Sequence, residues 1–182
     1  MKRISNLLLE IGSSMLIFVF LFPQPSMAED VVNSSYEIVV IGNRAFGNLV
    51  VSGDYREAIK RISGTVDRHH PFSAPNNLCV VYTAIGQYEA ALPFCDKAIE
   101  VAEWKSRPGP GRLKDRVQMV TIAALAHSNR GVARVLSGDE AGGEDDFQAA
   151  IELKNDMRAP LRNFARMSIG SSEPVAVIIR SR

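Results

Sequence analysis

The sequence predicts an all-α fold of about three stacked antiparallel helical hairpins, with short extended segments near both ends. Three stretches support this, because each has a helix-like run, then a glycine, then a second helix-like run. The glycines are Gly53, Gly86 and Gly138, and a polar residue follows each one. This is expected where a residue of positive φ ends one helix before the next begins. Gly53 and Gly86 are about 33 residues apart, the length of one helical-hairpin repeat.

Residues 1–28 have the order of a secretory signal peptide. A cationic start at Lys2 is followed by an apolar run from Met15 to Phe22 and by the small residues Ser26 and Ala28. The apolar run is far shorter than the roughly 20 residues that a spanning helix needs. We therefore expect cleavage after Ala28 and a periplasmic or secreted protein with no membrane span in its processed form.

The charge balance argues against nucleic-acid binding. Cleavage removes two basic and one acidic side chain from totals of 21 and 20, which leaves no net charge. Proteins that bind nucleic acid through phosphates carry a basic excess or a concentrated basic stripe. One basic cluster is present, but prolines and glycines interrupt it and it reads as a solvated loop; its members are Lys105, Arg107, Arg112, Lys114 and Arg116.

The second hairpin has the clearest helical pattern. Small and apolar residues follow steps of three and four, which places them on one helix face: Tyr88, Ala91, Cys95, Ala98 and Ile99. Small side chains on such a face let two helix axes approach closely, and stacking of neighbouring hairpins then makes the core.

The third hairpin follows an insertion of about 18 residues relative to the repeat length. Two prolines and two glycines between Arg107 and Gly111 cannot continue a helix, so we expect a loop there. Residues 113–136 then read as one long helix, and Phe147, Ala150 and Ile151 repeat the apolar pattern in the helix after it.

Three stretches, Ala45–Ile59, Asn77–Leu92 and Asn129–Ile151, resemble the tetratricopeptide repeat family, and the middle one matches its signature best. With the signal-peptide order of residues 1–28, the chain resembles an exported bacterial protein of this kind. The resemblance covers about half of the chain. It implies a helical domain over residues 43–157, between an extended segment (29–42) and a C-terminal tail (158–182). The resemblance also implies a concave groove, lined by the first helices of the hairpins, that takes an extended peptide. Asparagines suit such a groove, because their amides can bond a peptide backbone as donor and as acceptor. The groove candidates are Asn43, Arg44, Asn76, Asn77, Thr83, Ser128, Asn129 and Arg130.

Two segments outside the repeats read as strands. Residues 36–42 and 174–180 are short, rich in β-branched residues and bounded by breakers. We leave open whether they pair with each other or dock singly. Residues 37–42 also resemble the TonB box, which offers a strand edge to a partner.

Cys79 and Cys95 fall on the two helices of the second hairpin. In an exported protein they can form a disulfide that closes a loop of about 17 residues. The alternative is that both are small core residues of packed helices.

Nothing in the sequence has the pattern of a catalytic, metal or cofactor site. His69 and His70 lack further ligands at zinc spacing. His127 and the pair Asp145 and Asp146 read as polar surface residues of helices. We therefore expect a non-enzymatic interaction or scaffold module, without cofactor, that binds a protein or peptide segment in its groove. The alternative is a regulatory or structural subunit of an envelope complex that contacts its partner through the terminal strands.

Overall fold

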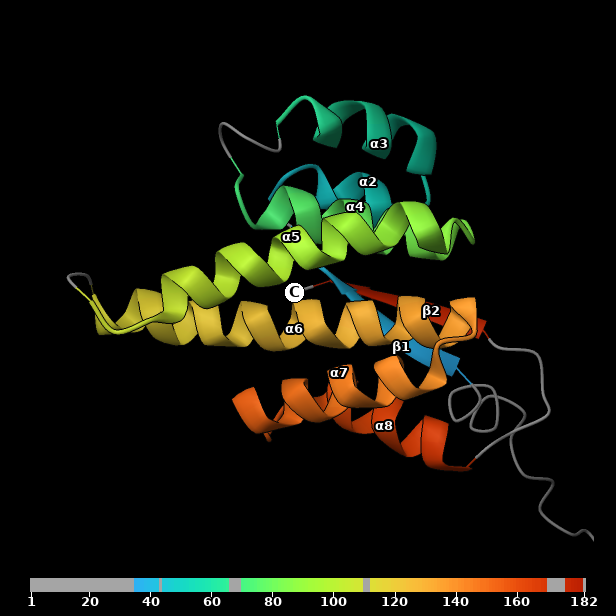
Figure 1. The fold of residues 1–182 in the computed structure, drawn as a ribbon. Coiled ribbons are helices and arrows are strands. Elements are labelled where there is room, and N and C mark those ends of the chain that lie inside the picture. Colours follow the sequence, from blue (N-terminus) through green and yellow to red (C-terminus); the bar gives the residue numbers. More distant parts are fainter. Residues whose placement is uncertain (1–34, 43, 66–69, 110–111, 170–175, 182) are drawn as a thin grey trace, which may run out of the picture.

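The computed structural model of the chain describes residues 35–42, 44–65, 70–109, 112–169 and 176–181. The predicted signal peptide and Asn43 lie outside these residues. The described part is mostly helical, as predicted (Figure 1). Its elements are β1 (Ser35–Val40), α2 (Gly47–Val51), α3 (Tyr55–Ser63), α4 (Ser73–Ala84), α5 (Tyr88–Ser106), α6 (Leu113–Ser137), α7 (Glu140–Leu153), α8 (Arg158–Ile169) and β2 (Ala176–Ser181).

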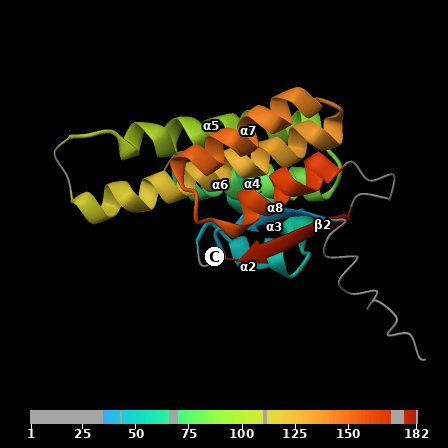
Figure 2. The same ribbon diagram turned by 90° about the horizontal axis from the view of Figure 1, so that it is seen from below.

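The helices pack against one another in chain order, from α2 to α8 (Figure 1). β1 lies across one side of α4, α6 and α8, and β2 lies beside β1 and contacts α2 (Figure 2). The C-terminal end of α5 and the N-terminal end of α6 project beyond the other helices (Figure 2). The predicted long helix over residues 113–136 is confirmed by α6.

The three glycine turns share one geometry. Gly53, Gly86 and Gly138 have φ values of 83°, 75° and 94°, the left-handed conformation that the sequence pattern predicts. In each turn, the N–H of the residue after the glycine donates to the carbonyl five residues earlier, at 2.9 Å. These bonds, which end the first helix of each pair in a Schellman motif, are Asp54 to Leu49, Gln87 to Tyr82 and Asp139 to Arg134.

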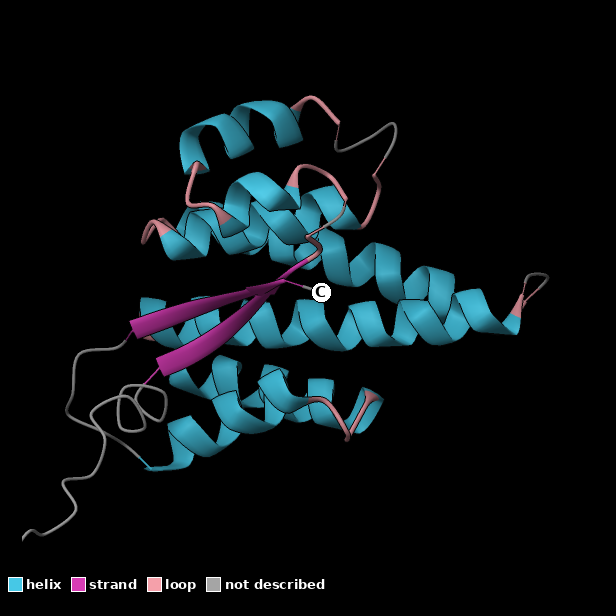
Figure 3. Cartoon of the chain, turned by 180° about the vertical axis from the view of Figure 1, so that it is seen from behind, coloured by secondary structure: helices cyan, strands magenta, loops and turns pink. Residues whose placement is uncertain are grey.

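Strands form at both predicted extended segments, and they pair with each other. β1 and β2 are parallel, with Ser35 opposite Ala176 and Val40 opposite Ser181 (Figure 3). Parallel strands need a long crossover, and here the entire helical array connects them. All six residues of β1 are buried, so this strand is part of the core.

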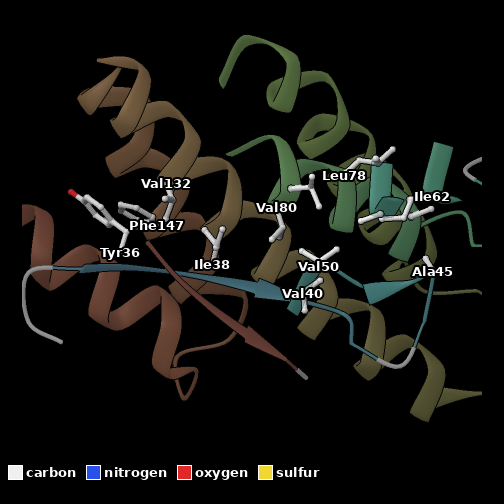
Figure 4. Packing of buried hydrophobic residues seen from close by; sticks show 13 residues of the cluster. Tyr36, Ile38, Val40, Ala45, Val50, Ile62, Leu78, Val80, Val132 and Phe147 are labelled. Atoms are coloured by element: carbon white, nitrogen blue, oxygen red, sulfur yellow. The ribbon is translucent and has the colours of Figure 1, made fainter. Parts of the chain in front are cut away.

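The main apolar core surrounds β1. Ile38 and Val40 pack in one cluster with residues from α2, α4, α6 and α7, among them Val50, Val80 and Phe147 (Figure 4). Val39 and Ile41 belong to two further clusters with α6. The strand is therefore packed on both faces.

A disulfide joins α4 to α5. Cys79 and Cys95 are bridged with their Cα atoms 4.9 Å apart, so of the two alternatives for these residues the structure has the covalent one. Both cysteines are buried beside Ala91 and Ala133.

The segment expected to be a C-terminal tail from residue 158 begins with a helix, α8, over residues 158–169. The buried residues of α8 include Asn163 and Arg166 as well as Ala159 and Pro160. Pro160, Phe164 and Met167 follow steps of four and three along this helix, so its sequence did carry an apolar stripe, and Phe164 and Met167 pack against the core.

Close packing at Ala91 predicts a sharp contrast between neighbouring positions on α5. Ala91 is fully buried, whereas Ala90 is exposed. We expect Ala91→Phe to lower the free energy of unfolding by about 1 to 3 kcal/mol through overpacking. Ala90→Phe is the control and should change it by less than about 0.5 kcal/mol. Chemical denaturation measures both, and equal values for the two variants would contradict the packing described here.

Candidate functional site

Buried asparagine side chains hold the backbone of β1. The carbonyl oxygen of the Asn129 amide accepts from the N–H of Val39 at 2.8 Å, and its NH₂ group donates to the Val39 carbonyl at 2.9 Å. The amide thus makes the two hydrogen bonds that the backbone of a neighbouring strand would make. The same two-bond pattern repeats two residues away on either side, with Asn163 on Glu37 (2.8 and 2.8 Å) and Asn77 on Ile41 (2.9 and 3.2 Å).

The three asparagines come from three helices that are distant in sequence. Asn77 lies on α4, Asn129 on α6 and Asn163 on α8. They bond Glu37 and Val39 of β1 and Ile41 directly after it, because the N–H and C=O groups of alternate residues point to the same edge of an extended chain. β2 occupies the other edge. Both edges of β1 therefore have hydrogen-bonding partners.

Two further residues complete this network. Asn76 donates to the Val39 carbonyl at 3.1 Å and accepts from Asn129 at 3.0 Å. The hydroxyl oxygen of Ser128 accepts from Asn163 at 3.1 Å. All five residues are at most 1% exposed. Buried peptide groups are costly to leave unpaired, so this set of bonds makes a buried strand compatible with a helical array.

The turn that follows Ile41 is also bonded by the side chain of Asn77. The Asn77 NH₂ group donates to the Arg44 carbonyl at 3.0 Å, and the Arg44 N–H donates to the Ile41 carbonyl at 3.2 Å. Ala45 and Phe46 follow with φ values of 47° and 55°. The chain therefore turns away directly after Ile41 and enters α2.

The structure thus brings four of the predicted groove residues together, namely Asn76, Asn77, Ser128 and Asn129. They bond an extended segment, but that segment belongs to the same chain. Asn163 is the member that the sequence did not reveal. It lies in the region expected to be a tail, where only recognition of α8 as a helix could have suggested it.

The other groove candidates have different positions. Thr83 is buried, and its hydroxyl donates to the Cys79 carbonyl of its own helix at 2.8 Å. The Arg44 side chain is exposed. Asn43 lies outside the described residues. The expectation that Thr83 lines a groove is therefore corrected, because its hydroxyl is bonded to a backbone carbonyl of α4.

Arg130 belongs to a charge cluster between α5, α6 and α7. Its guanidinium contacts Asp146 at 2.6 and 2.9 Å and Asp96 at 2.7 Å. Arg134 lies 3.1 Å from the second Asp146 oxygen. His127 lies between two carboxylates, with Nδ1 3.2 Å from Asp146 and Nε2 2.9 Å from Glu103.

The cluster corrects two expectations from sequence. Asp146 is 2% exposed and His127 is 9% exposed, so neither is a surface residue; Asp145 is exposed as expected. Burial by itself would raise the pKa of the Asp146 carboxyl. Hydrogen bonds from His127 and Arg130, with the positive charges of Arg130 and Arg134, outweigh burial and hold that pKa below its ordinary value.

Two pockets lie near the projecting end of α5 and α6. One, of about 510 Å³, is bounded by Ile41 and by the N-terminal half of α6. The other, of about 640 Å³, lies between the end of α5 and the start of α6. Phe72 borders both. The first pocket begins where β1 ends.

The asparagine network predicts a large effect of a single amide. Asn129→Ala removes the partners of the Val39 N–H and of the Asn76 carbonyl oxygen, both buried. We expect the free energy of unfolding to fall by about 2 to 4 kcal/mol. The control Asn48→Ala, at an exposed position of α2, should change it by less than about 0.5 kcal/mol. A fall of that small size for Asn129→Ala in chemical denaturation would contradict the role given to the amide.

The charge cluster predicts a pH dependence of stability. The folded pKa of Asp146 lies below its unfolded value of 3.8. The ionised carboxylate therefore stabilises the fold above about pH 4, and this contribution is lost as the pH falls below that range. We expect Asp146→Asn to be less stable at neutral pH and to lose less stability than the native chain between about pH 5 and pH 2. Denaturation across this range measures both slopes. The exposed neighbour offers the control Asp145→Asn, and a native slope in Asp146→Asn would contradict the assignment.

Neither a metal centre nor a membrane span is found in the part of the chain that the structure describes. Histidines, cysteines and acidic residues there form no group of three or more that could hold a metal ion. No helix there combines the length and the apolar character needed to cross a membrane. Comparison of the chain with protein-family models, curated proteins and solved structures finds no match in any of the three.

Proposed function

We propose that this chain is an exported interaction module of tetratricopeptide-like design, which binds an extended segment of a partner protein on the face of its helices that carries β1. The observation that carries the proposal is the bonding of β1 by Asn77, Asn129 and Asn163. An array that already holds one extended backbone through side-chain amides has the chemistry needed to bind another.

The geometry of the helices supports the tetratricopeptide-like part of this proposal. Three glycine turns have the same hydrogen-bonding pattern. The helices follow one another as α2 with α3, α4 with α5, and α6 with α7, and each pair is in contact. The three asparagines come from the first helices of successive pairs and from α8, the helix that would begin a further pair.

The disulfide supports export. Disulfides persist in oxidising compartments and are rare in the reducing cytosol. The bridge between Cys79 and Cys95 is buried in the most regular hairpin. Together with the signal-like order of residues 1–28, it favours a periplasmic or secreted protein.

The part of the face that remains open is beside β1. The asparagine amides are already bonded to the chain at β1. A partner would therefore bind the same face next to Ile41, where the pocket of about 510 Å³ lies. Val117 borders this pocket and is 57% exposed. The role proposed here is non-catalytic, since the buried polar side chains of the face are engaged in holding β1.

The alternative contact through the TonB-box-like segment 37–42 has less support. β1 is buried, with β2 on one edge and the asparagines on the other. A strand in this position has no edge to offer to a partner unless it leaves the core.

Site-specific photocrosslinking tests the proposed face. A benzoylphenylalanine at Val117 is expected to form a covalent adduct with a protein of the envelope fraction in living cells. The same group at Arg56, an exposed residue of α3 that borders neither pocket, is the control. Adducts at Arg56 but none at Val117, or none at either position, would contradict the proposal.

A further inference from the structure

The projecting end of α5 and α6 concentrates positive charge. Six cationic side chains border the two pockets, and one acidic side chain, Asp115, lies among them. The processed chain has no net charge on the sequence expectation, so this local excess is not a property of the whole surface. We call the region the cationic end surface; its cations are Arg44, Lys105, Arg107, Arg112, Lys114 and Arg116.

These cations are not neutralised within the described part of the chain. None of the six has a carboxylate within salt-bridge distance there, whereas Arg130 and Arg134 are paired with acids. Arg116 donates to the Gly109 carbonyl at 2.8 Å. Lys105 lies 5.5 Å from the centre of the Trp104 ring. Their positive charge is therefore available to a ligand.

The same surface exposes large apolar side chains. Trp104, Leu113 and Val117 are 65%, 67% and 57% exposed. Their neighbours in the pockets, Phe72 and Met119, are more buried. Exposed apolar side chains that gather at one place mark an interaction site more often than scattered ones do.

An amide on α6 completes the set. Gln118 borders the pocket next to Ile41 and is exposed. It precedes Asn129 by about three helical turns and so lies on the same side of α6. Its donor and acceptor are suited to a peptide backbone, as those of Asn129 are.

We propose that the cationic end surface binds a segment of a partner protein that combines acidic with apolar residues. The proposal rests on the function proposed above and names the chemistry of the segment. Carboxylates match the six cations, apolar side chains enter the two pockets, and the backbone meets Gln118. Concave pockets of this size favour a peptide over the flat surface of a lipid bilayer.

A display experiment tests this chemistry. A phage library of random dodecapeptides is selected on the full processed chain, and an enriched peptide is synthesised, labelled and measured by fluorescence anisotropy. We expect enriched sequences with net negative charge and apolar residues. Their affinity should fall as the salt concentration rises, because the surface charges are then screened.

Charge-reversal variants locate the binding site. Arg112→Glu with Lys114→Glu changes one cation of each pocket at the start of α6, where a carboxylate suits the helix dipole and folding is retained. We expect this pair to weaken binding about tenfold or more. Arg56→Glu, with a charge change of the same sign on α3, is the control and should leave the affinity within about twofold of the native value.

Three outcomes would overturn the proposal. Enriched peptides could be neutral or basic, acidic peptides could bind the double variant as tightly as the native chain, or vesicles of phosphatidylglycerol could bind while no peptide does. If neutral peptides bind and Val117 still crosslinks to a protein, the acidic chemistry is wrong and the proposed function stands. If no peptide binds and Val117 gives no adduct, both proposals fail.

Discussion

The structure depends on hydrogen bonds between asparagine side chains and the backbone of β1. A strand buried among helices has N–H and C=O groups on both edges, and helices cannot pair with them because their own peptide groups are already bonded. β2 satisfies one edge. Asn77, Asn129 and Asn163 satisfy the other, each with one donor and one acceptor. Without them, β1 could not lie where it does.

This constraint organises the rest of the fold. Each asparagine ties a different helix to the same strand, so α4, α6 and α8 are held in a common register. The apolar side chains of β1 fill the spaces between these helices and reach three core clusters. β1 is thus a structural element of the fold, and side chains of three helices bond its backbone.

The molecule therefore has a firmly bonded region and an open one. The disulfide, the charge cluster around Asp146 and the asparagine network all lie in the helices where the chain is most buried. The projecting end of α5 and α6 has exposed apolar side chains beside two pockets, and among the described residues no carboxylate lies within salt-bridge distance of the cations there. The surface that we propose for recognition is therefore at the projecting end, where accessible apolar side chains and cations occur together.

The sequence by itself determined the local features: the long α6 helix, the glycine turns and the extended segments near both ends. These follow from interactions within a few residues, such as positive φ at glycine and apolar spacing of three and four. Only the tertiary structure decided which partners those residues have. Asn163 bonds Glu37, which is 126 residues earlier in the chain, and Asn129 bonds Val39 of the same strand, 90 residues earlier. Asp146 and His127 are buried, and each contacts charged groups on another helix. Such contacts leave no periodic pattern in the chain, because a side-chain amide or carboxylate looks the same in sequence whether it meets water or a partner distant along the chain.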